Sequence, residues 1–203
     1  MIPLRRQAML RNVEPSPPNW DIAFGRAAPL EVDLGCGRGR YALERARSCP
    51  EVNVVALESR HKWITALRIR CQASGIANLR AIRCDVAEDL PVLFSACSVN
   101  AFTIHHPDPW WKKRHHKRRL IHPAFVELMR RLLKPGGWVF IQSDVPDLIS
   151  ENQVVFGGNK SFQLVDGDLV KREWMRGIMS HREARCLKQG IPVQRIAYVR
   201  TRP

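Results

Sequence analysis

The 203-residue chain lacks several features that mark special classes of protein. No apolar run reaches the length of about 18 residues that a membrane span needs, and residues 1–10 lack the apolar stretch of a secretory signal. The six cysteines form no CxxC pair and no close cluster, which argues against a zinc ribbon or a dense disulfide framework. We therefore expect a cytoplasmic protein with reduced thiols, no membrane partner and no bound metal.

Acidic residues are also scarce. The 19 Asp and Glu stand against 33 Lys and Arg, which gives a formal net charge of +14. An excess of that size attracts polyanions such as RNA, DNA or an acidic membrane face. Part of the charge is concentrated, because Lys112–Arg119 holds six formal charges in eight residues. The alternative is a basic surface that only keeps the chain in solution.

The composition is otherwise that of a globular protein. Hydrophobic residues make up 45% of the chain and charged residues 26%, and the length fits a single domain. Residues 1–29 are expected to be a lead-in segment, because their prolines discourage regular structure. We expect Trp20, Ile22 and Phe24 to dock on the domain, which the remaining residues, 30–203, should form.

Short apolar runs alternate with helical patterns from Leu30 onward. The predicted strands are Leu30–Leu34, Asn53–Leu57, Leu79–Cys84, Val99–Ile104, Trp138–Gln142 and a late Val193–Tyr198. The predicted helices are Tyr41–Arg47, Lys62–Ala73 and Ala124–Leu133. This alternation predicts an α/β fold with parallel strand pairs and right-handed crossovers.

Polar or flexible groups follow the predicted strands. The positions are Gly35–Gly39, Glu58, Asp85, His105–Asp108 and Asp144. Because ligands bind at the carboxyl ends of the strands in an open α/β sheet, we expect a cofactor crevice at this edge.

A glycine loop and an acidic residue point to a nucleotide-like ligand. Gly35, Gly37 and Gly39 follow the first strand, and Glu58 ends the second, where a carboxylate can accept hydrogen bonds from ribose hydroxyls. Without Glu58, a tight turn that binds nothing would explain the glycines. The third glycine of the dinucleotide motif is missing, because Arg40 occupies its position.

The acidic residues favour S-adenosylmethionine over NAD. Asp33 precedes the glycine loop and suits a cationic ligand better than a pyrophosphate. Asp85 ends the third strand and could accept from an adenine amino group, although it could equally be a helix N-cap.

One segment carries a more specific signal. His106–Arg119, with the sequence HPDPWWKKRHHKRR, resembles the PDPW-x-K-x-RH-x-KRR signature of the bacterial tRNA (guanine-N7)-methyltransferase family. Ser143-Asp144, Ser180–Glu183 and Gly190–Val193 are similar to later elements of that family. The resemblance extends over Trp20–Arg200, nearly the whole chain.

The resemblance implies a fold, a cofactor and a substrate. The fold is a single Rossmann-like class I methyltransferase domain, with a mostly parallel sheet, helices on both faces and an antiparallel last strand. S-adenosylmethionine is the implied methyl donor, and N7 of a guanine in the tRNA variable loop is the implied acceptor.

The resemblance also assigns roles to residues. The expected cofactor-binding residues are Asp33, Gly35, Gly37, Gly39, Glu58, Asp85 and Asp108, and Asp108 is also the expected catalytic residue. The expected substrate-binding residues are Lys112, Asp144, Ser180 and Glu183. Contacts to the rest of the RNA are expected from Lys113, Arg114, Lys117 and Arg118.

The chain departs from the family pattern at a few positions. Asp33 replaces the usual Glu, and Ser180 replaces the usual Thr. His105-His106 stands where an apolar or Asn-Phe pair is common, and Asn152–Asp168 looks less helical than its counterpart.

The chemistry leaves the role of Asp108 open. Guanine N7 has a lone pair and no proton to lose, so its methylation needs positioning rather than a strong base. Asp108 could hold the guanine edge, touch the methionine end of the cofactor, or only brace the Pro107–Pro109 turn. Trp110 and Trp111 could stack on a base, and we expect at least one to be pocket wall.

Other functions remain open at this point. The chain could be a class I methyltransferase that acts on another RNA, a protein or a small molecule, or a basic RNA-binding protein without catalytic activity. The sequence is compatible with a monomer or a homodimer.

Overall fold

The computed structural model describes residues 16–202, so about half of the expected lead-in lies outside the described residues. Within the described part, the expectation of no regular structure is wrong, because α2 (Trp20–Phe24) is a short helix. Asn19 caps it by accepting from the backbone of Ile22. Trp20 is buried and donates its Nε1 to the carbonyl of Leu93 at 2.8 Å, and Phe24 packs on the core. Ile22 does not dock, since it is 79% exposed.

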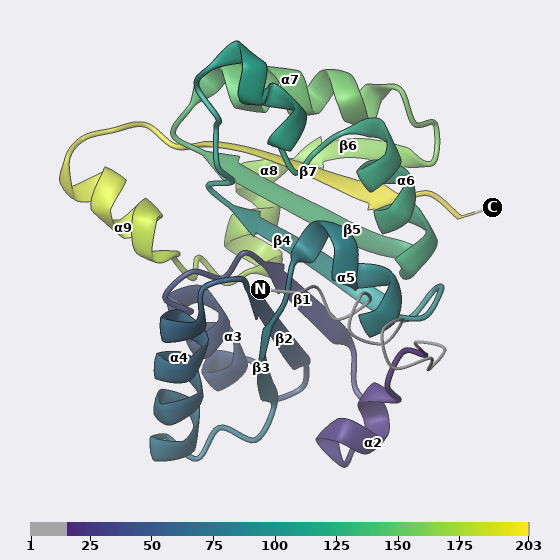
Figure 1. Cartoon of the computed structure of the whole chain (residues 1–203), viewed down its shortest axis with the longest axis vertical. Helices are drawn as coiled ribbons and strands as arrows, with labels where there is room; N and C mark the ends of the chain where they lie inside the picture. Colours follow the sequence, from purple (N-terminus) through teal and green to yellow (C-terminus); the bar gives the residue numbers. More distant parts are fainter. Residues whose placement is uncertain (1–15, 203) are drawn as a thin grey trace.

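A seven-stranded sheet forms the centre of the molecule, in the order β3-β2-β1-β4-β5-β7-β6 (Figure 1). The strands are β1 (Leu30–Leu34), β2 (Asn53–Glu58), β3 (Leu79–Arg83), β4 (Val99–His105), β5 (Leu133–Ser143), β6 (Phe162–Asp166) and β7 (Gln194–Arg200). The first five strands in this order run parallel, and β7 is antiparallel to both neighbours. The mostly parallel sheet with an antiparallel last strand is therefore confirmed.

Helices cover both faces of the sheet, as predicted. They are α3 (Arg40–Ser48), α4 (His61–Ala73), α5 (Val86–Leu93), η1 (Lys113–Arg118), α6 (Pro123–Leu132), α7 (Pro146–Gly157), α8 (Gly167–Leu169), η2 (Val170–Trp174) and α9 (His181–Lys188). One core joins α2, α5, α6 and α7 to one face. Two smaller cores join α3, α4 and η2 to the other face.

The carboxyl half of the chain differs most from the predicted elements. β5 begins at Leu133 rather than Trp138, because the strand pairs with Val99 before it reaches Pro135-Gly136-Gly137. The segment Asn152–Asp168 completes α7 and then forms β6. β6 is an edge strand with only one partner and two outward-facing residues in a row, so the sequence shows no clear alternation there.

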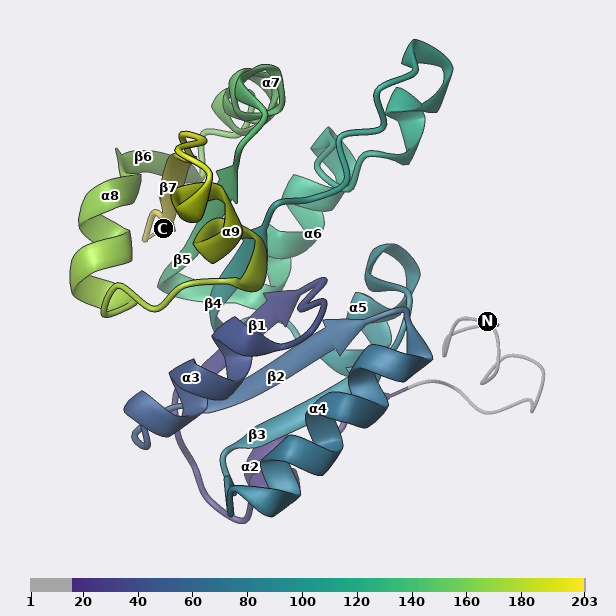
Figure 2. The ribbon, with the colours of Figure 1, turned by 90° about the vertical axis from the view of Figure 1, so that its left-hand side faces the viewer.

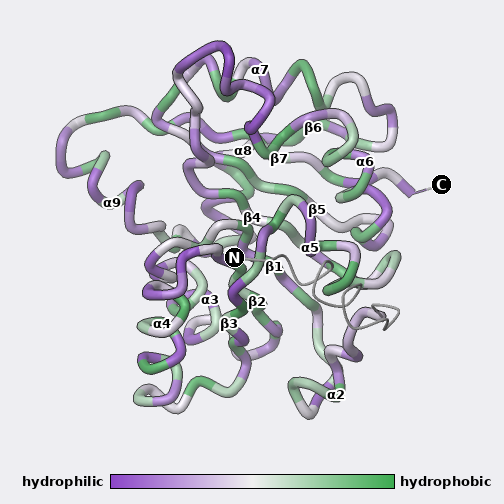
Figure 3. Tube along the Cα trace, in the orientation of Figure 1, coloured by the Kyte–Doolittle hydropathy of each residue, from purple (hydrophilic) through white to green (hydrophobic). Residues whose placement is uncertain are grey.

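Among residues 16–202, no helix combines the length and apolarity required to cross a membrane. The strands are largely hydrophobic, whereas the outer part of the loop between β4 and α6 is strongly hydrophilic (Figure 3). This loop contains η1 and projects from the body of the molecule (Figure 2). We call residues 106–122 the β4–α6 loop.

Candidate active site

A cavity of about 520 Å³ opens at the carboxyl ends of β1, β2, β3 and β4, which is an ordinary size for a small-molecule site. The chain order of the strands reverses between β1 and β4, and ligands in α/β sheets bind at such a point. The predicted site residues that line the cavity are Asp33, Gly35, Gly37, Glu58, Asp85, Asp108, Arg118 and Ser180. Those outside its lining are Gly39, Lys112, Lys113, Arg114, Lys117, Asp144 and Glu183.

The glycine loop wraps around the carboxylate that ends β2. Gly37 has a φ of +54° and donates its N–H to Glu58 Oε2 at 3.0 Å. Gly39 has a φ of +69°, and a Cβ there would lie 2.5 Å from the side chain of Leu67. The absence of a side chain at Gly39 therefore lets α3 pack closely on Leu67 of α4.

Glu58 is buried and already holds three hydrogen bonds. Its Oε1 accepts from the Ser59 hydroxyl at 3.1 Å and from the Arg60 backbone at 2.9 Å. Because a carboxylate offers about four acceptor sites, Oε2 retains a lone pair beside the Gly37 bond. Arg60 lies over the ring of Trp63 at 4.4 Å, and both side chains line the cavity.

Asp85 is a helix N-cap, and it also lies at the cavity wall. Its side chain accepts from the backbone of Ala87 at 3.0 Å, so it is the N-cap of α5. It also lines the cavity, at the end of β3 next to β2. The capping bond holds the carboxylate in place at the cavity wall.

Buried polar atoms without partners lie where β1 and β4 end. Asp33 Oδ1 accepts from the Thr103 hydroxyl at 3.2 Å and lies 4.0 Å from His105 Nε2. Among the described residues, Asp33 Oδ2 and both ring nitrogens of His105 have no hydrogen-bond partner. Burial raises the pKa of Asp33 to about 7, Thr103 opposes this and Glu58 adds to it. Burial lowers the pKa of His105, and nearby Lys171 lowers it further.

The turn that carries Asp108 is strained. His106 and Trp110, on either side of Pro107–Pro109, have φ values of +51° and +48°, which non-glycine residues rarely adopt. Asp108 is exposed at the cavity edge. Trp110 lines the cavity and Trp111 is 73% exposed, which agrees with the expectation that one of the two is pocket wall.

Asp144 joins the turn to α9. His106 Nδ1 donates to Asp144 Oδ1 at 2.8 Å, and Arg182 donates to both carboxylate oxygens at 2.8 and 2.6 Å. The guanidinium group holds the pKa of Asp144 well below its usual range. Cys186 lies near enough for His106, Asp144 and Cys186 to resemble a metal site, with ligand atoms within 4.8 Å of one another. The carboxylate of Asp144 is already paired with the guanidinium group of Arg182.

Glu183 lies beneath the cavity rather than at its surface. It is 1% exposed and accepts from Lys171 Nζ at 2.9 Å, Gln142 Nε2 at 3.1 Å and Arg195 Nη2 at 3.1 Å. With Ser180 it also forms the capping box that begins α9. Burial alone would raise the pKa of Glu183, but Lys171 and the other donors lower it to about 2.

Several residues of the cavity were not expected from the sequence. They are Tyr41, Ser59, Arg60, Trp63, His181 and Arg182. Arg60 and Trp63 follow Glu58 closely and could have been suspected for that reason. His181 and Arg182 lie on α9 and reach the cavity only through the tertiary structure.

Comparison with solved structures gives the class of the protein. The chain is similar to the 16S rRNA methyltransferase KamB, with a TM-score of 0.65 and 19% identity over 90% of this chain and 93% of that one. It is also similar to TrmN from Thermus thermophilus, with a TM-score of 0.59 and 22% identity over 97% of this chain and 48% of that one. The fold is that of a class I methyltransferase.

Comparison of sequences gives the family. The methyltransferase model Methyltransf_4 matches residues 27–196. A tRNA (guanine-N(7)-)-methyltransferase of Nitrosomonas europaea is 35% identical over 91% of this chain and 82% of its own length. One of Myxococcus xanthus is 43% identical over 65% of this chain and 64% of its own length. The chain belongs to this methyltransferase family.

Proposed function

We propose that this protein is a cytoplasmic tRNA (guanine-N7)-methyltransferase, which transfers the methyl group of S-adenosylmethionine to N7 of a guanine in the tRNA variable loop. The observation that carries the proposal is the position of the β4–α6 loop. It brings Asp108 and Trp110 to the edge of an acid-lined cavity and holds the basic run outside it. The curated relatives that cover most of the chain have this activity in their names.

The cavity fits S-adenosylmethionine. Its lining holds four carboxylates, which suit the sulfonium and ammonium groups of this ligand, and also four arginines: Arg38, Arg60, Arg118 and Arg182. We assign Glu58 to the ribose hydroxyls and Asp85 to the adenine amino group. The amino-acid end then lies at β1 and β4, where Asp33 Oδ2 would accept from the ammonium group and His105 could bind the carboxylate or a water. When bound, the cofactor supplies a methyl group on a sulfonium centre.

The chain's own residues position the guanine. N7 attacks through an in-plane lone pair, so the main requirement is alignment of that lone pair with the methyl carbon. We assign Asp108 to the guanine edge, where a carboxylate can accept from N1 or the exocyclic amine. Trp110, which Arg118 covers at 5.1 Å, provides a flat wall on which the base can stack.

The remaining predicted substrate residues have two kinds of role in this proposal. Ser180 lines the cavity at the start of α9, so it is available to the substrate. Glu183 and Asp144 act from beneath, because Glu183 caps α9 and Asp144 ties it to the β4–α6 loop through His106 and Arg182. Lys112 stays a candidate for the phosphate nearest the target guanine.

The proposal is tested by incubating the protein with labelled S-adenosylmethionine and bulk tRNA, and digesting the product to nucleosides. The expected label is in 7-methylguanosine. Label in another nucleoside or in protein would identify a different class I methyltransferase. A protein that binds tRNA but leaves it unlabelled would be a binding protein, and the acid-lined cavity would then have no explanation.

A further inference from the structure

A second group of basic side chains stands beside the cavity. Arg38 lies in the glycine loop and lines the cavity, Arg40 begins α3, and Arg185 lies on α9 one turn after His181. All three arginines are exposed. We call Arg38, Arg40 and Arg185 the α3–α9 basic cluster. In Figure 1, α9 lies on the same side of the molecule as α3, although it comes much later in the chain.

His181 connects the two elements that carry the cluster. It begins α9 and lines the same cavity as Arg38. Arg40 follows Arg38 by two residues at the start of α3, and Arg185 follows His181 by one turn of α9. The pKa of His181 is lowered by partial burial and by the charges of Arg38, Arg40 and Arg185, which agrees with this placement.

The cluster's charges are not paired with carboxylates in the described part of the chain. None of its three arginines forms an ion pair with a carboxylate of residues 16–202. Glu44, one turn after Arg40, is paired with Arg47 at 3.2 Å. Uncompensated like charges repel one another and raise the local potential, which favours binding of an anion.

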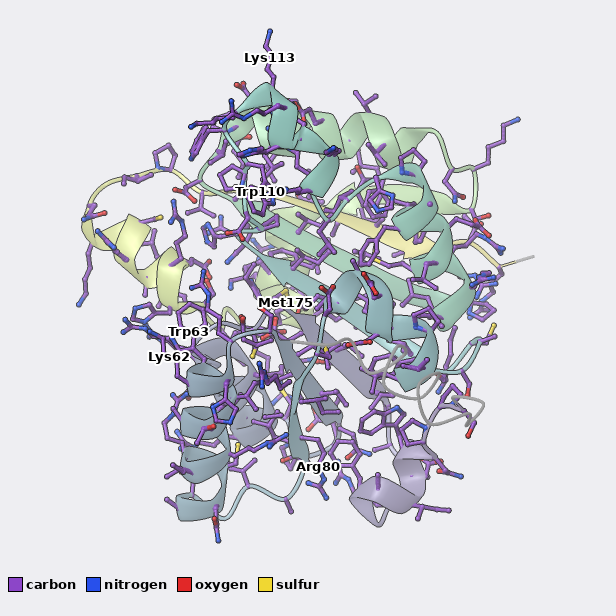
Figure 4. All side chains as sticks on the ribbon, in the orientation of Figure 1. Lys62, Trp63, Arg80, Trp110, Lys113 and Met175 are labelled. Atoms are coloured by element: carbon purple, nitrogen blue, oxygen red, sulfur yellow. The ribbon has the colours of Figure 1, made fainter. Side chains whose placement is uncertain are left out.

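The β4–α6 loop carries basic side chains at the other side of the cavity. Lys113, Arg114 and Lys117 are exposed and do not line the cavity. In Figure 4, Lys113 points outward from the tip of this loop, whereas Lys62, at the start of α4, lies on the opposite side of Trp110. Exposed basic side chains thus lie on either side of the cavity mouth.

We propose that the α3–α9 basic cluster is an RNA-binding surface, which holds the phosphates on one side of the target guanine while the β4–α6 loop holds those on the other side. Contacts on both sides stretch the strand across the mouth of the cavity, and the nucleotide between them can turn its base inward. The inference rests on the proposed function, because it takes a tRNA loop as the polyanion.

The test is the salt dependence of tRNA binding for R40Q/R185Q. Arg38 is left intact because it lines the cavity. Each lost phosphate contact lowers the slope of log affinity against log salt by about 0.7–0.9, so we expect the slope to fall by about 1.4–1.8. The conservative R40K/R185K should keep a slope close to that of the parent. Calorimetry should show S-adenosylmethionine binding within about twofold of the parent for both variants, which confirms folding.

A matched control removes two charges elsewhere. Arg131 lies just before β5, and Lys160 lies just before β6. Both are exposed, and both lie at the edge of the sheet opposite to the cavity. R131Q/K160Q changes the net charge equally and should leave the slope unchanged. Phosphate ethylation interference then shows which phosphates of the tRNA the protein contacts. R40Q/R185Q should lose interference on one side of the target guanine, and K113Q/R114Q/K117Q on the other.

The outcomes separate this inference from the proposed function. If the parent methylates tRNA but R40Q/R185Q keeps the parental slope, the inference alone is overturned. The inference would also be overturned if R40Q/R185Q and K113Q/R114Q/K117Q lost interference at the same phosphates. An equal fall in slope for R131Q/K160Q would overturn it as well. A parent that does not methylate tRNA would overturn the proposed function, and the inference with it.

Discussion

Asp33 is an acidic side chain in surroundings that disfavour its ionised form. It is buried at the end of β1, its Oδ2 has no partner among the described residues, and burial raises its pKa to about 7. A neutral acid there can give up its proton when a cation arrives, because the ion pair then replaces the lost hydration. At the residue scale, the charge of the ligand therefore determines the charge of Asp33.

This predicts that the affinity for S-adenosylmethionine rises with pH. Below the pKa of about 7, Asp33 must lose a proton to pair with the ammonium group, so affinity gains up to about tenfold per pH unit and levels off above it. Burial holds the pKa of His105, which lies 4.0 Å from Asp33, well below its usual value. Calorimetry between about pH 5.5 and 7.5 measures the effect. Asp33→Asn should bind more weakly and remove the slope, and a slope that persists in it would assign the titration to another group.

Asp108 differs from Asp33 because it is exposed at the cavity edge. Asp108→Asn should therefore fold and bind S-adenosylmethionine like the parent, but lose most methyl transfer to tRNA. We expect a fall in kcat of about 100-fold or more, comparable with loss of one positioning contact in an active site. Single-turnover assays with saturating tRNA measure it. Turnover close to that of the parent would leave Asp108 as only a brace for the turn.

At the scale of elements, the β4–α6 loop combines a fixed base with a free tip. Arg119 anchors the base, since it donates Nε to the Pro109 carbonyl at 2.9 Å and pairs with Glu151. Arg118 covers Trp110, so it belongs to the cavity wall as well as to the basic run. Besides Lys112, the exposed charges of the run that do not line the cavity are those of Lys113, Arg114 and Lys117.

We expect K113Q/R114Q/K117Q to lower the salt slope of tRNA binding by about 2–3 units, at 0.7–0.9 per lost contact. S-adenosylmethionine affinity should hardly change, because none of the three side chains lines the cavity. Filter binding over a range of salt measures the first quantity and calorimetry the second. If both the affinity for tRNA and its salt slope match the parent, the run is only a solvated surface.

At the scale of the whole molecule, a buried ion pair joins distant segments. Lys171 of η2 and Arg195 of β7 meet on Glu183 of α9, below the cavity. This network holds α9, and with it Ser180 and His181, against the sheet. The position of this part of the cavity wall thus depends on the contacts of Lys171, Glu183 and Arg195.

Lys171→Met should destabilise the fold, because it leaves the Glu183 carboxylate buried with one cation fewer. Removing one partner of a buried pair costs about 3–5 kcal/mol, and Arg195, still 3.1 Å from Glu183, should keep the loss near the lower end. Urea unfolding measures it, and K171M/E183Q should recover part of the loss. An unfolding free energy equal to that of the parent would show that the pair adds nothing.

The same pair predicts loss of stability in acid. The pKa of Glu183 is lowered from 4.5 to about 2 in the folded protein, so the unfolded state binds a proton more readily. This contribution is complete above about pH 4.5 and decreases as pH falls toward 2. Glu183→Gln should show a flatter decline of the unfolding free energy over that window.

Local patterns in the sequence were enough to predict the parallel half of the sheet and the carboxylates at its edge. Alternating apolar runs and glycine turns act over a few residues, so strands β1 to β4 were found within one or two residues of their observed ends. Asp33, Glu58 and Asp85 followed, because parallel strands bring their carboxyl ends to one edge. The HPDPWW segment identified the family independently of any contact.

Only the tertiary structure decided how the carboxyl half of the chain is arranged. β6 is an edge strand whose pairing depends on β7, and no local period marks it. The burial of Glu183 among Lys171 and Arg195, and the place of His181 beside the same cavity as Arg38, depend on where α9 packs. Such contacts join residues far apart in the chain, and their energy depends on burial and distance, which a linear sequence does not contain.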